Sequence, residues 1–266
     1  MKKWISVLLA LCLLALPLFA FAENVPTGTD AVLTSTDAEG ETGEDPVPAT
    51  MTLSNVPDVA TFILDPIVWC EIQIVPAVLT AEDGARDVYL VAIRGTGSSM
   101  KKANNVLACF LSSFNLSSKY YEMVRDAVYE YVPEGSAILM AGHSLGGMVA
   151  QQLSCTDEFT AKYELISTLN VGSPYVKTKA EKREGTLVRC VDRHDVIPKL
   201  GIGALLDFFH YSSFIRTDGG YLGDPDGAHN LSYRRADLWG AYDVRGVENG
   251  GATLTLNTAD IVSLTA

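Results

Sequence analysis

The chain has 266 residues, of which 48% are hydrophobic, and a formal net charge of -12. This length suits one folded domain with its own apolar core. An acidic chain without a basic run excludes nucleic acid as an expected partner, because contacts between basic side chains and phosphates supply most of that affinity. The negative charge also gains nothing on an anionic membrane, so neutral esters or neutral lipid surfaces fit better.

The N-terminus is typical of an exported protein. A Met-Lys-Lys start precedes an apolar run over 7–21, and the small-residue sequence Ala-Phe-Ala follows at 20–22. Residues 1–22 are therefore predicted to be a secretory signal peptide. The apolar run is short for a transmembrane helix, and no later run is long enough for one. We expect a soluble secreted protein, extracellular or associated with the cell surface.

A compositionally biased segment comes next. Residues 23–55 are rich in Thr, Pro, Gly, Ala, Asp and Glu and contain no Lys, Arg or aromatic residue. Such a segment buries too little apolar area to offset the entropy of ordering it. We predict a disordered acidic linker over 23–55 and one folded domain over 56–266.

Four cysteines follow the predicted signal peptide. Export permits disulfides, and four oxidised cysteines allow three pairings. Two of the four lie in strand-like runs, where a buried thiol is an equally good interpretation, and the pairing stays open. The four residues are Cys70, Cys109, Cys155 and Cys190, of which Cys70 and Cys190 are the two in strand-like runs.

The first elements of the predicted domain form a hairpin. Alternating apolar residues over 69–79 and 87–94 flank a turn at 82–84, which is the pattern of two paired strands. The second strand ends in Arg94-Gly95-Thr96-Gly97, and a glycine-flanked turn at a strand end is suited to presenting a backbone N–H. The next segment, 98–113, has apolar residues at helical spacing. A helix packed on the sheet and a mobile lid over a site are both consistent with it.

The remaining pattern alternates helices and strands. A helix is predicted from Ser117 or Ser118 to Val132, and strands are predicted over 137–141, 165–171 and 186–191. This order predicts an α/β fold with a mostly parallel central sheet and helices on both faces. Functional groups in such folds gather at the carboxyl ends of the strands.

One of these strand ends carries the motif Gly-x-Ser-x-Gly, at 142–146, followed by a helix to about residue 155. Glycines remove the Cβ atoms that would collide in a sharp strand-to-helix turn, so Ser144 is exposed as a nucleophile. The N–H of Leu145 then points toward a developing oxyanion at the positive end of the helix dipole. His143 is expected to point elsewhere and to pack beneath the turn.

A serine nucleophile requires a histidine base and a carboxylate that orients it. The order Ser, acid, His that this fold class uses leaves His210 and His229 as candidates for the base. Asp192 and Asp195 both lie at a strand end and are candidates for the acid. Asp207 and Asp237 are expected to be solvated. An acidic glycine-rich loop carrying Asp218, Asp224 and Asp226 lacks a recognisable calcium-ligand spacing.

Several of these pieces together resemble the class 3 (fungal-type) lipase family of α/β-hydrolases. They cover most of 88–233 in the family's order, and they are Val91 to Thr96, Gly142 to Gly147, Val171 to Pro174, Asp195 to Pro198, Phe209 to Ser213 and Ala228 to Tyr233. The resemblance implies Asp195 as the orienting acid, His229 as the base and a structural role for His210. It also implies an oxyanion hole formed by Thr96 and Leu145.

We therefore expect a serine ester hydrolase, most simply a lipase that cleaves acylglycerols, with Ser144, Asp195 and His229 as its triad. Its partner would be an acyl ester or neutral lipid, at a lipid–water interface if the lid interpretation holds. A monomer that needs no metal or organic cofactor is expected. Two alternatives stay open: an esterase for another acyl group, such as a phospholipid or feruloyl-type ester, and a non-catalytic surface-displayed protein that retains the fold.

Overall fold

The computed structural model describes residues 49–66, 70–95, 119–174, 186–199 and 213–265. The chain divides into two compact units, Met1–Asp45 and Pro46–Ala266, and every described residue belongs to the second. Several predictions fall on residues outside the described ones: the signal peptide, the helix over 98–113, Thr96, Cys109, Asp207 and His210.

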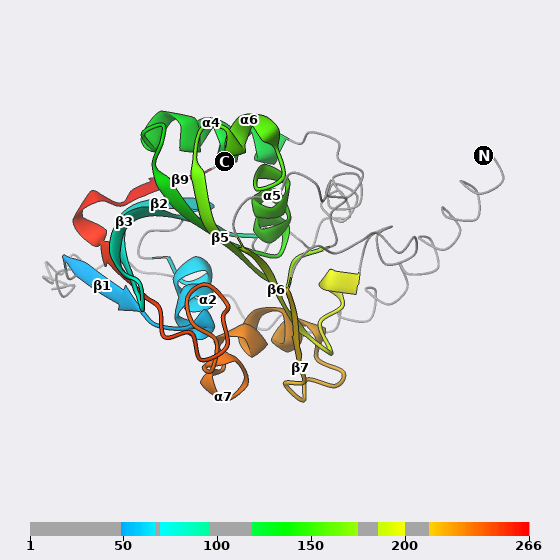
Figure 1. Ribbon diagram of the computed structural model, residues 1–266. Helices are drawn as coiled ribbons and strands as arrows, with labels where there is room; N and C mark the ends of the chain where they lie inside the picture. Colours follow the sequence, from blue (N-terminus) through cyan, green and yellow to red (C-terminus); the bar gives the residue numbers. More distant parts are fainter. Residues whose placement is uncertain (1–48, 67–69, 96–118, 175–185, 200–212, 266) are drawn as a thin grey trace, which may run out of the picture. The chain divides into compact units, whose positions relative to one another are not determined.

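A mixed β-sheet runs through the whole described unit (Figure 1). Strands β3 to β7 follow one another as parallel neighbours, and antiparallel strands extend the sheet beyond β3. The strand order is β1-β8-β2-β3-β4-β5-β6-β7, with β9 also paired to β2. The strands are β1 (Thr50–Leu53), β2 (Ile72–Ala81), β3 (Gly84–Ile93), β4 (Ala137–His143), β5 (Glu164–Val171), β6 (Thr186–Asp192), β7 (Ser213–Thr217), β8 (Thr253–Asn257) and β9 (Val262–Leu264).

Helices cover both faces of this sheet. Figure 1 shows α4, α5 and α6 on one face and α2 and α7 on the other. None of the helices in the described ranges is long and apolar enough to cross a bilayer. The helices are α2 (Val56–Leu64), α4 (Lys119–Tyr131), α5 (Leu145–Leu153), α6 (Asp157–Thr160), α7 (Ala236–Trp239), the π-helix η6 (Gly227–Leu231) and the short 3-10 helices η4 (Ile197–Lys199), η7 (Ser232–Arg234) and η8 (Thr258–Asp260).

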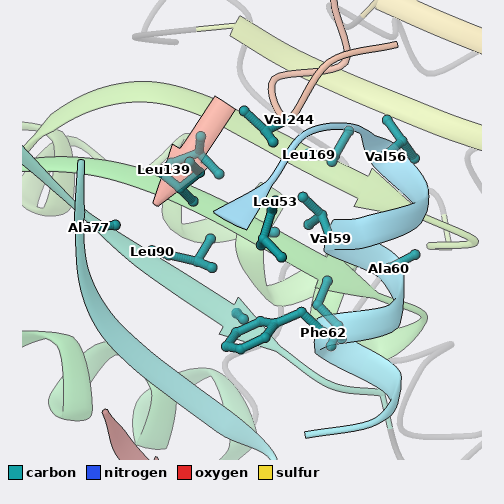
Figure 2. Packing of buried hydrophobic residues seen from close by; sticks show 14 of the residues in the cluster. Leu53, Val56, Val59, Ala60, Phe62, Ala77, Leu90, Leu139, Leu169 and Val244 are labelled. Atoms are coloured by element: carbon teal, nitrogen blue, oxygen red, sulfur yellow. The ribbon is translucent and has the colours of Figure 1, made fainter. Parts of the chain in front are cut away.

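The core has two layers because strand side chains alternate between faces. On β4, Leu139 packs toward α2, whereas Ile138 and Met140 pack toward α4 and α5. Figure 2 shows the α2 side, where Phe62 and Val59 lie over residues of the central strands such as Leu139. All seven residues of β4 are buried, which explains why its sequence is a continuous apolar run and not an alternating one. This buried strand positions the motif that follows it.

The structure agrees with most of the predicted elements and extends the folded region toward the N-terminus. The predicted hairpin is β2 and β3, and the predicted strands over 137–141, 165–171 and 186–191 are β4, β5 and β6. The fold agrees with the expected α/β-hydrolase architecture. Strands β1, β7, β8 and β9 and helix α2 were not predicted.

The boundary between linker and domain was predicted too late in the chain. Thr50–Leu53, inside the expected linker, pairs with β8 as an edge strand, and Leu53 is buried in the core. Asn55 then caps α2, accepting a hydrogen bond from the N–H of Asp58 at 3.0 Å. The linker was predicted from the composition of 23–55 as a whole. Its last residues alternate in burial as a strand does, and the composition of the longer segment hid this short strand.

The helix cap at Asn55 gives a test of this boundary. Replacing Asn55 with Ala leaves the Asp58 N–H without its acceptor, and the free energy of unfolding should fall by about 1 kcal/mol in urea denaturation. Ser54→Ala is the matched control, since the hydroxyl of Ser54 has no partner among the described residues. Equal stability of both variants and wild type would contradict an ordered helix start at this point.

Candidate active site

Ser144 occupies the sharp turn between β4 and α5. Its backbone has φ 55° and ψ -125°, a region that residues with a side chain rarely adopt. The N–H of Ser144 donates to the carbonyl of Val171 at the end of β5, at 3.0 Å. The turn is therefore fixed to the neighbouring strand at its strained residue.

The glycines of the motif are required by close backbone contacts. A Cβ on Gly142 would lie 2.5 Å from the backbone of Gly147, and a Cβ on Gly146 would lie 2.2 Å from the carbonyl oxygen of Ile93. Real Cβ atoms do not approach this closely, so α5 reaches its position only because both residues lack a side chain. This confirms the reason given for the motif from the sequence.

The Ser144 side chain lies against the end of β3. A Cβ on Gly95 would lie 2.6 Å from Ser144 Cβ and 3.2 Å from Ser144 Oγ. The Tyr120 hydroxyl, on α4, donates to the carbonyl of Arg94 at 2.6 Å and holds this strand end. The Ser144 hydroxyl is buried and makes no hydrogen bond to any described residue. The N–H of Leu145 opens α5, so it has no acceptor within the helix.

Asp195 and His229 form a buried pair. His229 Nδ1 lies 2.9 Å from Asp195 Oδ2, and the two residues are 8% and 0% exposed. Two further donors hold the same carboxylate: the Tyr233 hydroxyl reaches Oδ2 at 2.7 Å, and the N–H of Ile197 reaches Oδ1 at 2.9 Å. Since the carboxylate is an acceptor, His229 Nδ1 carries a hydrogen and Nε2 is left as the basic nitrogen.

Gly172 makes room for this pair. Its φ is +61°, and a Cβ there would lie 2.9 Å from Asp195 Oδ2 and 3.2 Å from His229 Nδ1. Its N–H donates to the carbonyl of Cys190 at 3.0 Å, which fixes the turn after β5 to β6. A side chain at position 172 would therefore push against the histidine–carboxylate contact itself.

His143 lies beneath the turn, as the sequence predicted, but it also contacts His229. The side chain is 3% exposed, and Nε2 lies 2.8 Å from the backbone carbonyl oxygen of His229. The two imidazole rings lie 4.5 Å apart between centroids, tilted by 43°. Burial, followed by the nearby charge of His229, lowers the pKa of His143 well below 6.5.

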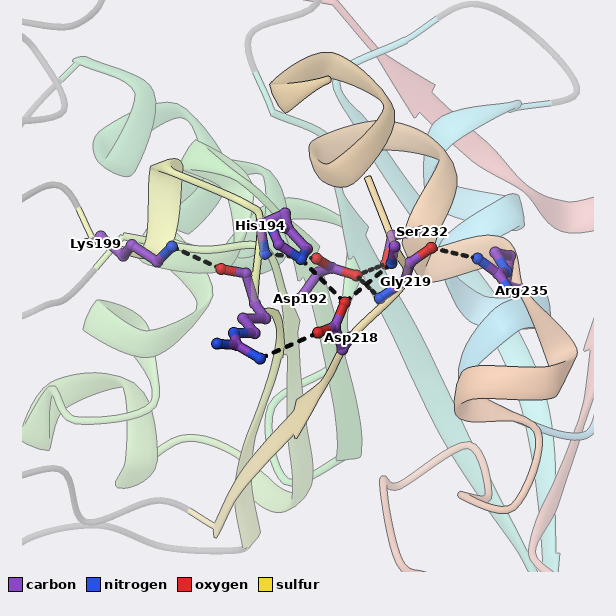
Figure 3. Close-up of polar contacts among 9 residues, drawn as sticks. Asp192, His194, Lys199, Asp218, Gly219, Ser232 and Arg235 are labelled. Atoms are coloured by element: carbon purple, nitrogen blue, oxygen red, sulfur yellow. Dashed lines mark hydrogen bonds and ion pairs between the residues drawn. The ribbon is translucent and has the colours of Figure 1, made fainter. Parts of the chain in front are cut away.

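Asp192, the other candidate acid, has a different set of contacts. Its carboxylate accepts from the N–H of His194, the N–H of Gly219 and the Ser232 hydroxyl, at 2.7, 2.8 and 2.6 Å. Figure 3 shows these contacts joining the end of β6 to the segments on either side of His229. Asp192 therefore braces the loop that carries His229, and Asp195 is the carboxylate that contacts the imidazole.

The other acidic candidates have local partners. Asp218 lies within 3.3 Å of Arg193 and 3.0 Å of His194, and Asp237 pairs with Arg235. Asp224 accepts from the N–H of Gly227, and Asp226 accepts from Asn230. No group of His, Cys, Asp and Glu suited to a metal ion occurs among the described residues.

The two cysteines in strand-like runs, for which a buried thiol and a disulfide were both open, are buried. Cys70 and Cys190 are 2% and 0% exposed, and neither forms a disulfide. Burial raises the pKa of both thiols. Neither is therefore a reactive thiolate near neutral pH.

Tyr233 and Gly172 were assigned no role from the sequence, although both lie in the segments that carried the resemblance. The signal for Tyr233 was its position four residues after His229, a spacing that places two side chains on one side of a helical turn. The Tyr233 hydroxyl also accepts from the N–H of Asp192 at 3.1 Å, so it connects both strand-end aspartates.

Comparisons with known proteins bear on this arrangement. No curated protein matches the chain. Among solved structures, the Lip2 lipase from Yarrowia lipolytica is similar over 64% of this chain and 66% of its own, with 15% sequence identity and a TM-score of 0.31. A similarity of that size adds nothing to the arrangement derived above.

The family described as Lipase (class 3) matches residues 85–203, which include β3 from its second residue, β4 to β6, Ser144 and Asp195. The motif, the strained turn and the parallel strands β4, β5 and β6 fall in this same segment. Residues 85–203 of this chain are therefore similar to the class 3 lipase family.

Proposed function

We propose that the protein is a secreted serine lipase that hydrolyses acylglycerols through an acyl-enzyme, with Ser144, Asp195 and His229 as its triad. The observation that carries this proposal is the buried 2.9 Å contact between Asp195 and His229, in a protein whose Ser144 sits on a strained glycine-flanked turn. The family match supports an acyl ester as the substrate.

In this proposal His229 removes the proton from Ser144 Oγ as the oxygen attacks the ester carbonyl carbon. Asp195 keeps the imidazole in the tautomer with hydrogen on Nδ1 and stabilises the imidazolium that forms. His229 then gives its proton to the leaving alcohol oxygen. Water, activated by the same imidazole, attacks the acyl-enzyme and releases the fatty acid and free Ser144.

The tetrahedral intermediates carry a negative oxygen that needs donors. The N–H of Leu145 is available at the start of α5, where the helix dipole favours negative charge. Thr96 is proposed as the second donor because it directly follows Gly95, which lies against Ser144. Tyr120 supports this arrangement by holding the carbonyl of Arg94.

Secretion is proposed from the predicted signal peptide at 1–22, and residues 23 to about 48 then form the proposed acidic linker. A monomer acting on a neutral lipid surface fits the acidic composition. An esterase for phospholipid or feruloyl-type esters uses the same triad and stays an alternative that substrate profiling separates.

The direct test is hydrolysis of p-nitrophenyl esters from two-carbon to long acyl chains by the chain lacking residues 1–22. We expect the highest kcat/KM on longer chains and a loss of about a thousandfold or more in Ser144→Ala and His229→Ala. Asp195→Asn should also lose about a thousandfold, because the histidine tautomer is no longer fixed. His194→Ala is the matched histidine control, since its ring contacts Asp218 instead.

A serine-directed phosphonate separates enzyme from non-catalytic protein. Rapid labelling of Ser144, lost in His229→Ala, is the expected result. Wild-type protein that is inert on every ester and is not labelled would favour the non-catalytic alternative. Activity that prefers short or aromatic acyl groups would favour the esterase alternative instead.

Gly172 provides a test of the histidine–carboxylate geometry. Gly172→Ala should lower kcat by about tenfold to a hundredfold, since its Cβ would displace the atoms that orient His229. Gly135→Ala is the control, because Gly135 also has a positive φ, of +86°, but has nothing within 4 Å of an added Cβ. A kcat in Gly172→Ala equal to that in Gly135→Ala would show that a Cβ at position 172 does not disturb the histidine–carboxylate contact.

Tyr233 provides a test of the support beneath Asp195. Burial and the adjacent Asp195 raise the pKa of Tyr233 well above 10, so its hydroxyl stays protonated and keeps donating. Removing this donor in Tyr233→Phe should lower kcat by about tenfold to a hundredfold, the size expected for one hydrogen bond to a charged group. Tyr163→Phe is the control and should retain kcat. The buried hydroxyl that it loses donates to the carbonyl of Val128 in α4 and to the carbonyl of Val132, directly after α4.

A further inference from the structure

His143 makes one contact that packing beneath the turn does not require. It is the last residue of β4, directly before Ser144, and its Nε2 lies 2.8 Å from the backbone carbonyl oxygen of His229. The ring also faces the His229 ring at 4.5 Å between centroids and the edge of Tyr233 at 6.2 Å. The residue before the proposed nucleophile is thus bonded to the backbone of the proposed base.

The direction of this bond is fixed by chemistry. A carbonyl oxygen only accepts, so Nε2 of His143 carries the hydrogen and donates it. The ring is neutral, because burial and the charges of His229, Arg94 and Arg234 together lower its pKa well below 6.5. The hydrogen bond to the His229 carbonyl raises the pKa of His143, but its effect is smaller than that of burial or of the His229 charge, which both lower this pKa. A neutral ring with hydrogen on Nε2 leaves Nδ1 without one.

We propose that His143 is a positioning residue, whose Nε2–H holds the backbone of His229 at a fixed place relative to Ser144. This proposal rests on the triad proposed above, because it assigns His143 a part in the same reaction.

Asp192 braces the residues before and after His229 through Gly219 and Ser232, whereas the bond from His143 acts on the main chain of His229 itself. His229 lies in η6, a π-helical turn of five residues, and such short turns supply little rigidity of their own. Asp195 holds the imidazole at Nδ1 and leaves the position of the main chain open. The bond from His143 adds a constraint at the His229 carbonyl, from a strand whose end is itself anchored, since the N–H of Ser144 is bonded to Val171.

The neutrality of His143 suits the reaction. When His229 accepts the serine proton, a positive charge appears on a ring only 4.5 Å away. A second imidazolium at that distance would destabilise the first, whereas a neutral ring leaves the charge to Asp195. His143 thus donates the N–H that positions His229 and does not compete with His229 for the serine proton.

The test compares His143→Gln and His143→Leu on the best p-nitrophenyl ester. The amide Nε2 of Gln reaches the position of the histidine Nε2, whereas Leu fills the space without a donor. We expect Leu to lower kcat by about tenfold to a hundredfold with KM changed less than about twofold, and Gln to recover most of the loss. Recovery by a side chain of different shape identifies the donor and not the packing.

Stability against pH is a second readout for the same two variants. The folded pKa of His143 lies below its unfolded value of 6.5, so the unfolded chain binds more protons and stability falls as pH drops below about 6.5. Wild type should therefore lose more stability than His143→Gln between pH 6.5 and 4.5. The groups whose charges act on this ring, His229, Arg94 and Arg234, are unchanged in both proteins.

Nitrogen-15 NMR of the wild-type histidine rings removes any dependence on variants that fail to fold. A His143 ring that is neutral at pH 6 with hydrogen on Nε2 supports the proposal. Hydrogen on Nδ1, an imidazolium at that pH, or unchanged kcat in a folded His143→Leu overturns it.

Failure of the proposed function has a distinct signature. If wild type cleaves no ester and no phosphonate labels Ser144, the triad and the positioning role fail together. If wild type is active and labelled but His143→Leu matches it in kcat, the triad stands and only the positioning role is withdrawn.

Discussion

The structure depends on a close approach of backbones around one strained residue. Ser144 has a positive φ. The chain before it contacts α5 because residue 142 is glycine, and the chain after it contacts the end of β3 because residue 146 is glycine. The bond from the N–H of Ser144 to Val171 balances part of that strain. Everything proposed for catalysis follows from a hydroxyl held at this turn.

Buried strands make the turn rigid. β4 is buried along its whole length, with one set of side chains against α2 and the other against α4 and α5. Its parallel neighbours β3 and β5 end at the same edge, where Gly95 and Gly172 come close to the site from two sides. The parallel register therefore determines which loops meet at Ser144, and the helices on both faces keep that register in place.

The strand–turn–helix around Ser144 was predictable because its pattern is local: an apolar run, glycines at fixed spacing and a helix of small residues. Only the resemblance selected Asp195 over Asp192 as the acid. In the structure the Asp195 carboxylate contacts the His229 ring, whereas the Asp192 carboxylate contacts Ser232. β1 was hidden within a polar segment, because an edge strand of four residues carries little apolar signal. The roles of Gly172 and His143 depend on contacts between residues distant in sequence, which no local pattern encodes. For Tyr233 the spacing from His229 was a local signal, but its bond to Asp195 was not encoded locally.

The most direct test of the central claim is a crystal structure of the chain lacking residues 1–22 after reaction with a serine-directed phosphonate. The account predicts phosphorus on Ser144 Oγ, a phosphonyl oxygen within hydrogen-bonding distance of the Leu145 N–H, and His229 Nε2 directed at Oγ. The bonds from His229 to Asp195 and from His143 to the His229 carbonyl should persist. Phosphorus on another residue, or a different histidine beside Ser144, would contradict the account.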